Sequence, residues 1–226
     1  MVPKVLFTSY LCDSSDPIIK IILNKWVILN PDYEIKYFSD NDIDIFFSTH
    51  PKNMVYKTLK NGVAKADFFR ICYINKYGGY WFDIDLEPIS VDNNIPRKGS
   101  IHLFDAGYGN ISYMFIGGDK EQKLFDLVIN EVSSRIINSS IKNGSNLINI
   151  TGPRIIQKIV FDFLNIPEEL RKNGIMKGGE TPISYLKGSD FEFEYTKIIF
   201  PVHKSKEYEI LQQKHNKYLY TMYNFI

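Results

Sequence analysis

The sequence predicts an α/β fold, in which helices flank an open mixed sheet within a single domain of residues 1–226. Strand-like and helix-like segments alternate through the first half of the chain, which is the pattern of such a sheet. A chain of 226 residues is also long enough to build one substantial core. No internal repeat, low-complexity tract or linker divides the sequence, so one domain is the simplest interpretation.

The first half of the chain alternates between short apolar runs and amphipathic segments. The run at 5–8 predicts a buried strand, and Pro17 begins a helix whose apolar residues recur at helical spacing as far as residue 29. Residues 33–38 alternate like a second strand. Ser39 is expected to cap a short helix, because serine readily accepts a hydrogen bond from the first helical turn.

Two glycines, Gly78 and Gly79, separate the next helix from the next strand. The helix begins near residue 61 and stops at this pair, because glycine tolerates the left-handed conformation of a helix end. The strand at 80–82 runs directly into Asp83. Further along, the sequence predicts strands near 101–104 and 113–116, helices near 121–137 and 154–164, and short strands with a polar helix near 207–217.

Composition excludes several classes of function. The formal net charge is +1, so no overall field attracts the chain to nucleic acid or to an anionic membrane. Cys12 and Cys72 are too few for a disulfide framework. No apolar stretch approaches the roughly 20 residues that span a bilayer, and the N-terminus does not resemble a signal peptide. A cytoplasmic location is therefore expected.

Two aspartates, Asp83 and Asp85, follow the apolar strand. If the chain stays extended, their carboxylates point the same way and repel each other, and a divalent cation relieves that repulsion. Carboxylate oxygens suit Mn²⁺ or Mg²⁺, which also bind phosphate. The tripeptide Asp-x-Asp alone is weak evidence, since residues 40–44 match it twice at what we interpret as a solvated helix start. The later pair differs because it ends a strand, where α/β sheets place their ligands.

Residues 64–71 and 77–88 closely resemble the sugar-binding region of glycosyltransferase family 32. The shared pattern is an alanine or serine, then Asp-x-x-Arg, a helix, Tyr-Gly-Gly, an aromatic strand and Asp-x-Asp. The family includes capsular-polysaccharide transferases, initiating mannosyltransferases and α-1,4-galactosyltransferases, and the glucosylating clostridial toxins share its core. Residues 2–7, 30–34 and 151–153 extend the likeness, which covers roughly 2–160 and leaves 161–226 divergent.

This resemblance implies a GT-A-type fold and a divalent cation, Mn²⁺ or Mg²⁺, at the Asp-x-Asp motif. By position, Asp85 is expected to be the main metal ligand, and Asp83 to lie near the donor ribose and the ion. Asp67 is expected to hold sugar hydroxyls, and Arg70 to contact sugar or phosphate. The alternative for Asp67 and Arg70, which share one helix face, is an ordinary surface ion pair.

Further donor contacts are implied by position in the family pattern. Thr8, Ser9 and Tyr10 follow the first strand, where relatives bind the nucleotide. Tyr10 either stacks on the base or is a simple loop tyrosine. Trp81 either lines the donor pocket or fills the core. Asn110 resembles a family asparagine near the reacting sugar, although loop asparagines usually just form turns.

The C-terminus departs from the family pattern. Relatives often end with Tyr-x-x-His-x-Trp, whose histidine approaches the metal, and here Thr221 stands in the place of that histidine. Either Asn224, His215 or His203 replaces the missing ligand, or water does, or metal binding is weakened.

The sequence therefore predicts a retaining glycosyltransferase that moves a sugar from a nucleotide-sugar, expected to be a UDP-sugar, to a glycan or glycoprotein hydroxyl and forms an α-linkage, as in polysaccharide biosynthesis. A nucleotidyltransferase is disfavoured, because residues 5–16 contain no glycine for a phosphate loop. The remaining alternative is a catalytically weakened carbohydrate- or nucleotide-sugar-binding protein on the same fold. The sugar, the acceptor and the oligomeric state stay open.

Overall fold

The computed structural model describes residues 1–95, 99–105, 111–138, 149–163, 193–196, 205–211 and 213. Its strands are β1 (Val5–Ser9), β2 (Glu34–Phe38), β3 (Gly79–Phe82), β4 (Ile101–Asp105), β5 (Ile111–Gly118) and β6 (Phe193–Thr196). Its helices are α1 (Pro17–Leu29), α2 (Asp40–Ser48), α3 (Asn53–Thr58), α4 (Gly62–Tyr77), α5 (Val91–Asn94), α6 (Lys123–Asn138) and α7 (Pro153–Phe163), and residues 206–211 are also helical.

The strands form one mixed sheet in the order β2-β1-β3-β5-β4-β6. β1 is parallel to β2 and β3, whereas β5 is antiparallel to both β3 and β4, and β6 is parallel to β4. Phe82 at the end of β3 pairs with Phe115 in the middle of β5, so the first residues of β5 extend beyond the end of β3. The carboxyl ends of β1 and β3 therefore share one edge of the sheet with the amino end of β5. The predicted α/β class with a mixed sheet is confirmed.

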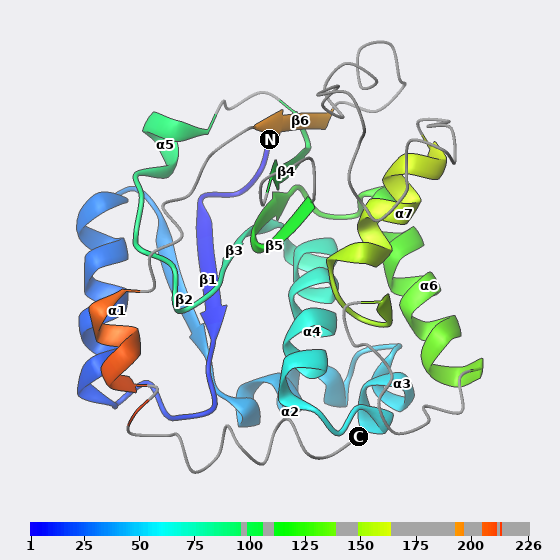
Figure 1. Ribbon diagram of the computed structural model, residues 1–226, viewed down its shortest axis with the longest axis horizontal. Coiled ribbons are helices and arrows are strands. Elements are labelled where there is room, and N and C mark those ends of the chain that lie inside the picture. The colour runs from blue at the N-terminus through cyan, green and yellow to red at the C-terminus, as the bar shows by residue number, and fades with distance from the viewer. Residues whose placement is uncertain are drawn as a thin grey trace.

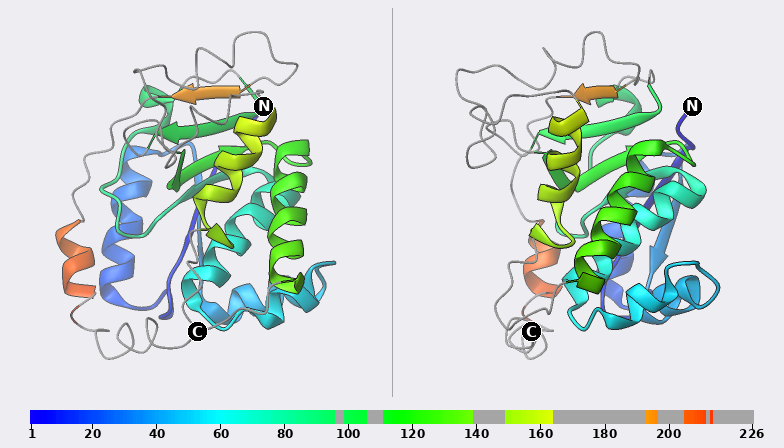
Figure 2. Two further views of the ribbon diagram at one scale, coloured as in Figure 1. Left: turned by 45° about the vertical axis from the view of Figure 1, so that its right-hand side comes forward. Right: turned by 90° about the vertical axis from the view of Figure 1, so that its right-hand side faces the viewer.

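Helices cover both faces of the sheet (Figures 1 and 2). Successive strand residues point to opposite faces, so neighbours in sequence enter different hydrophobic clusters. Leu6 and Phe82 pack in the cluster under α1, whereas Phe7 and Trp81 pack in the cluster that also holds residues of α4, α6 and α7. The strand β3 thus separates two cores, and its two faces have different surroundings.

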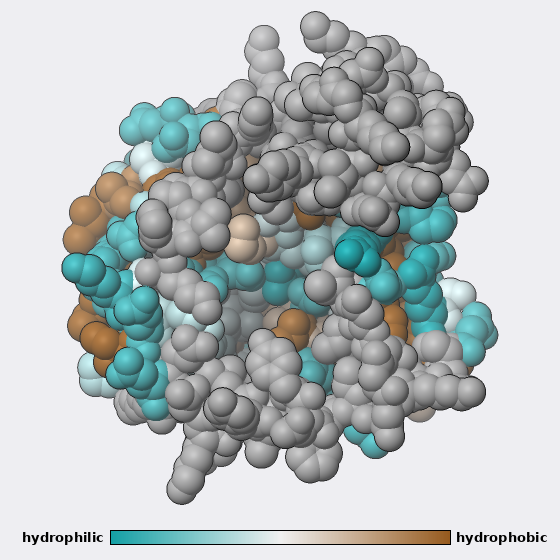
Figure 3. Space-filling model, viewed as in Figure 1, coloured by the Kyte–Doolittle hydropathy of each residue, from teal (hydrophilic) through white to brown (hydrophobic). Residues whose placement is uncertain are grey.

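On the α1 side, the helix begins where the sequence predicts. Asp16 accepts a hydrogen bond from the backbone N–H of Ile18, and proline follows at the first helical position. The inner face of α1 buries Trp26, while the outer face exposes Ile21 and Ile28. Figure 3 shows hydrophobic residues along the left side of the molecule, where α1 lies, and a hydrophilic centre.

On the other side, α4 and its glycine stop position the start of β3. Asn61 caps α4 by accepting hydrogen bonds from two backbone N–H groups of its first turn. The helix ends at Gly78, which has φ 73°, and Gly79 follows with φ 112°. A Cβ atom on Gly79 would lie 2.9 Å from the carbonyl oxygen of Val5. Glycine therefore lets β3 approach β1 closely, and this fixes the place where β3 starts.

The structure confirms the strands and the longer helices that the sequence predicts, including the Ser39 cap of α2, where Asp42 completes a capping box. Two short helices, α3 and α5, were not predicted, because six and four residues are too few to show helical periodicity. In the tail, β6 and the start of the polar helix appear at the expected positions. None of the described helices has the length and apolar character needed to cross a bilayer.

Candidate active site

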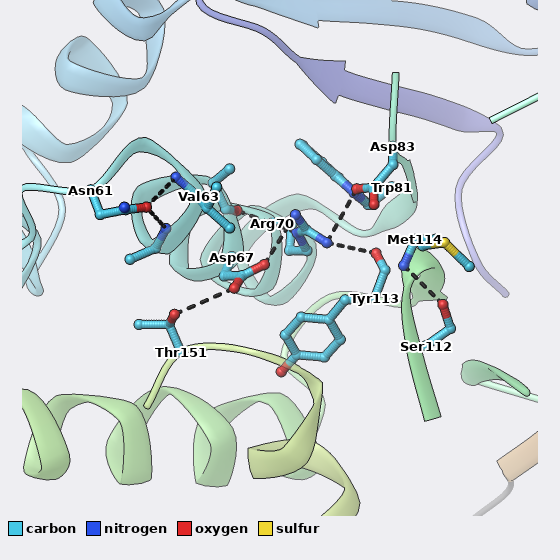
Figure 4. A network of polar contacts seen from close by, with 12 residues as sticks. Asn61, Val63, Asp67, Arg70, Trp81, Asp83, Ser112, Tyr113, Met114 and Thr151 are labelled. Carbon is cyan, nitrogen blue, oxygen red and sulfur yellow. Dashed lines mark hydrogen bonds and ion pairs between the residues drawn. The ribbon is translucent and has the colours of Figure 1, made fainter. Parts of the chain in front are cut away.

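A network of polar contacts lies at the sheet edge where β3 ends and β5 begins (Figure 4). Its centre is Arg70 of α4, with Asp67 of the same helix on one side and Asp83 on the other. Tyr113 of β5 and Thr151, which precedes α7, complete it. Four segments that are distant in sequence therefore meet at one place.

The Arg70 guanidinium contacts side chains and a backbone carbonyl from three other parts of the site. Nη2 lies 3.1 Å from Oδ1 of Asp67, and Nη1 lies 3.3 Å from Oδ1 of Asp83. Nη1 also donates a hydrogen bond to the backbone carbonyl of Tyr113 at 2.7 Å. The rings of Trp81 and Tyr113 lie 4.4 and 5.5 Å from the guanidinium carbon. Arg70 is 5% exposed, so it links buried groups and is not the surface ion pair that the alternative interpretation required.

Asp67 is a buried carboxylate with two partners. Besides Arg70, it accepts a hydrogen bond from the hydroxyl of Thr151, 3.3 Å from its Oδ2 atom. Burial raises the pKa of Asp67 to about 6, and the nearby charge of Asp83 adds to the increase, whereas Arg70 and Thr151 oppose it. The carboxylate therefore gives up its proton less readily than a surface aspartate does.

Asp83 is held at both its backbone and its side chain. Its N–H donates to the carbonyl of Met114 at 2.7 Å, which continues the pairing of β3 with β5. Its Oδ1 atom accepts a hydrogen bond from the indole N–H of Trp81 at 2.7 Å and also contacts Arg70. Neither contact uses Oδ2, and the side chain is 27% exposed. One oxygen is thus fixed by the protein, and the other remains available to a ligand.

Asp85 lies in a turn. The N–H of Leu86 donates to the carbonyl of Asp83 at 3.0 Å, and Ile84 and Asp85 form the turn between them. The assumption that the chain stays extended through Asp83 and Asp85 is therefore wrong, because β3 ends at Phe82. The turn is anchored by Ile84 and Leu86, which are buried in the α1-side cluster, while Asp85 is half-buried.

The end of β1 lies beside this turn. Tyr10 is half-buried, and its pKa is raised by burial first and then by Tyr208, Cys12 and Asp85, which are close enough to act on it. Tyr208 also meets the Tyr10 ring edge to face, with the centroids 6.2 Å apart. Ser205 donates its N–H to the carbonyl of Asp85 at 3.2 Å. The segment at 205–208 thus contacts both the β1 end and the aspartate turn.

Two of the residues that were expected to contact the nucleotide-sugar are buried in the protein. Thr8 is completely buried, and its hydroxyl finds no hydrogen-bond partner within the described structure. Trp81 is 2% exposed and packs in the core, which matches the core-filling alternative for this residue. Ser9 and Tyr10, by contrast, are only half-buried. Asn110, His203, His215, Thr221 and Asn224 lie outside the described residues.

The charges and donor atoms of this site fit a divalent cation. Asp67 and Asp83 share the guanidinium of Arg70, so one negative charge remains when both carboxylates are ionised. Within the described ranges, no group of three or more His, Cys, Asp or Glu residues is arranged to hold a metal ion. Ions such as Mg²⁺ are commonly bound by one or two carboxylates together with substrate phosphates and water, and Asp83 and Asp85 provide such a pair.

Two contributors were not predicted as part of the site. The carbonyl of Tyr113 accepts a hydrogen bond from Arg70. Its position depends on the register in which β5 pairs with β3, and local sequence patterns do not predict that register. Thr151 belongs to the Thr-Gly-Pro segment that resembles the family, and this likeness is a signal that could have assigned it a role.

Comparison with known proteins agrees with this geometry. The family described as "Glycosyltransferase sugar-binding region containing DXD motif" matches residues 19–100. Residues 19–100 are therefore similar to a glycosyltransferase sugar-binding region. Asp67, Arg70, Asp83 and Asp85 all lie within the matched range. The match confirms the predicted resemblance to glycosyltransferases over this part of the chain.

A solved glycosyltransferase structure shares the fold. The PaToxG glycosyltransferase is 13% identical, with a TM-score of 0.55, and the similarity covers 76% of this chain and 71% of that one. At this identity the likeness concerns the fold, and it agrees with the expected GT-A-type sheet around the DXD region. A glycosyltransferase involved in the glycosylation of the major capsid of PBCV-1 is 12% identical, with a TM-score of 0.38, over 73% of this chain and 78% of that one. No curated protein sequence matches this chain.

Proposed function

We propose that the protein is a metal-dependent, retaining glycosyltransferase that moves a sugar from a UDP-sugar to a hydroxyl of a glycan or glycoprotein and forms an α-linkage. The observation that carries this proposal is the state of Asp83, whose Oδ1 is fixed by Trp81 and Arg70 while its Oδ2 has neither contact. Asp85 follows in the adjoining turn, half-buried. A pair of this kind at the carboxyl end of a strand suits the binding of a donor diphosphate.

Asp83 and Asp85 would hold the ion, Mn²⁺ or Mg²⁺. When bound, such an ion neutralises the charge that develops on the diphosphate leaving group. We assign the sugar hydroxyls of the donor to Asp67, since a carboxylate accepts hydrogen bonds from them. Because the guanidinium of Arg70 is occupied by Asp67, Asp83 and a carbonyl, we assign it the task of holding the two carboxylates in place.

The nucleotide would lie at the end of β1. Tyr10 presents a half-buried ring beside the aspartate turn, and such a ring can stack on a base. Retention would follow from attack on the same face of the sugar from which the diphosphate leaves. The acceptor oxygen forms the new bond to the anomeric carbon, the bond to diphosphate breaks, and a diphosphate oxygen takes the acceptor's proton.

The test is hydrolysis of UDP- and GDP-sugars with and without Mn²⁺, since transferases usually release some sugar to water. We expect turnover of a UDP-sugar that depends on the ion. Asp85→Asn should reduce it by more than about 100-fold, since loss of a group that merely supports a metal ligand already costs about 10–100-fold. The fold should persist, because Asp85 is half-exposed. Asp40→Asn is the matched control: it changes an exposed aspartate of another Asp-x-Asp triplet, at the start of α2, and should leave turnover unchanged.

The alternative, a catalytically weakened protein that binds nucleotide-sugars, is favoured by Thr221, which stands where relatives carry a histidine. Donor binding measured by thermal shift together with hydrolysis separates the two functions, because a bound ligand raises apparent stability whether or not it reacts. Stabilisation by a UDP-sugar and Mn²⁺ without hydrolysis would favour the binding protein. Unchanged turnover in Asp85→Asn would exclude the proposed role of the metal.

A further inference from the structure

The two tryptophans of the chain are buried on opposite faces of the same strand. Trp26 of α1 is completely buried and stacks on Phe82, with ring centroids 4.2 Å apart. Its indole N–H finds no hydrogen-bond partner in the described structure. Trp81 lies in β3 itself and packs against Phe7 at 5.5 Å on the other face. Its indole N–H, unlike that of Trp26, is used: it donates to Oδ1 of Asp83 at 2.7 Å.

This hydrogen bond restricts an otherwise mobile carboxylate. A side chain that is 27% exposed has room to rotate, and an aspartate has two equivalent oxygens to offer. Two donors, the indole N–H and Nη1 of Arg70, meet at Oδ1. Hydrogen bonds to an ionised carboxylate are shorter and stronger than those between neutral groups. Because both donors contact Oδ1, the two carboxylate oxygens of Asp83 are no longer equivalent, and the direction of Oδ2 is set.

The donors themselves are rigid. Trp81 is fixed by the core on its α4 side, where Phe7 and Phe69 meet its ring. Arg70 is fixed by Asp67, by the carbonyl of Tyr113 and by the two aromatic rings beside it. The position of Asp83 is thus determined by two buried side chains, Trp81 and Arg70, which are 2% and 5% exposed.

We propose that Trp81 is a positioning residue, whose indole N–H orients Asp83 so that Oδ2 faces the divalent cation and diphosphate of the donor. This inference rests on the proposed function and adds to it the residue that aims the metal ligand. Groups that hydrogen-bond to a metal ligand typically change metal affinity or activity by about 10–100-fold when they are removed. Trp81 should therefore act on cation affinity more than on the reaction itself.

The first test compares Trp81→Phe with Trp26→Phe. Both changes replace a buried indole by a smaller ring, but only the first removes a hydrogen bond. The dissociation constant of Mn²⁺ in the presence of UDP is measured by electron paramagnetic resonance, which needs no turnover. We expect Trp81→Phe to raise it about 10–100-fold, with kcat largely restored at saturating Mn²⁺. Trp26→Phe should leave both values near those of the wild type.

A second variant guards against a general loss of structure in Trp81→Phe. In the Trp26→Phe background, the remaining tryptophan is replaced by its benzothiophene analogue, in which sulfur takes the place of the N–H and the ring keeps its size. The same loss of Mn²⁺ affinity is expected. In the metal-free protein, Asp83→Asn should shift the indole N–H resonance of Trp81 and leave that of Trp26 in place.

Several outcomes would overturn the inference. The benzothiophene protein and its Trp26→Phe parent could bind Mn²⁺ with the same affinity. That result would show that the N–H has no role in orienting Asp83. If Asp83→Asn leaves the chemical shift of the Trp81 indole N–H unchanged in the metal-free protein, the N–H likewise has no role in orienting Asp83. If the wild type binds Mn²⁺ and hydrolyses donor in these cases, the proposed function stands while the positioning role fails. Absence of Mn²⁺ binding in the wild type would refute both.

Discussion

The two faces of β3 are equally well buried but are built from different chemistry. On the α1 side, Phe82 stacks on Trp26, and the contact is wholly apolar. On the α4 side, the strand buries a guanidinium between two carboxylates and packs aromatic rings around it. The first face contributes stability through the area that it removes from water. The second face first has to offset the cost of taking charges out of water, so its net contribution to stability is small.

The difference between the two faces indicates that the residues on the α4 side orient the carboxylates of Asp67 and Asp83. A buried ion network is seldom the most stable way to fill a core, yet here Arg70 aligns Asp67 of α4 with Asp83 at the end of β3. Substitutions on the α1 face should therefore change the free energy of unfolding alone. Substitutions on the α4 face should change stability and donor turnover together.

The largest effect is expected for Arg70→Met. It leaves two buried or partly buried carboxylates without their shared cation, which should lower the free energy of unfolding by about 3–5 kcal/mol. Donor hydrolysis should fall by more than about 100-fold at temperatures where the variant is still folded. Urea denaturation and a hydrolysis assay measure the two effects. Arg70→Lys is the control, since it keeps the charge but loses the fork that reaches both carboxylates; full activity in that variant would contradict the orienting role.

A pH-dependent effect is expected for Asp67→Asn. The pKa of Asp67 is raised to about 6 in the fold, so between about pH 4 and pH 6 the folded chain binds more protons than the unfolded chain does. The stability of the wild type should therefore fall as the pH rises through this window, by at most about 3 kcal/mol from this group. The difference in unfolding free energy between wild type and Asp67→Asn, measured at several pH values, should show this slope. A constant difference would mean that Asp67 titrates normally.

A purely structural effect is expected for Phe82→Leu on the α1 face. It shortens the stack on Trp26 and should cost about 1–2 kcal/mol of unfolding free energy. The affinity for Mn²⁺ and the turnover per folded molecule should stay unchanged, because the side chain faces away from Asp83. Reduced Mn²⁺ affinity in a folded Phe82→Leu protein would show that the two faces are coupled.

The smallest effect is expected for Tyr113→Phe. The phenol oxygen is buried and has no hydrogen-bond partner in the described structure, while the ring lies beside Arg70. Removing an unsatisfied hydroxyl should change the unfolding free energy by less than about 1 kcal/mol, and it can increase stability. Thermal unfolding monitors this change. A loss of several kcal/mol would mean that the hydroxyl has a partner after all.

Much of this arrangement follows from local sequence patterns. Asp67 and Arg70 stand three residues apart on α4 and therefore share a face, and the glycine pair fixes where β3 starts. The turn after Asp83 was missed, because an apolar strand gives no sign of where its pairing stops. The enclosure of Arg70 was missed for a related reason. It depends on β5 and on the segment before α7, which meet α4 only through long-range packing.

The contact between Arg70 and the carbonyl of Tyr113 has a consequence for synthesis of the chain. The region that matches the family ends at residue 100, but this hydrogen bond needs β5, and the partner of Asp67 at position 151 is made later still. A ribosome that has released only the matched region has delivered Asp83 together with Trp81 and Arg70, but without the carbonyl that holds Arg70 and the hydroxyl that holds Asp67. The region that matches the family is thus shorter than the part of the chain that contains every contact of this polar network.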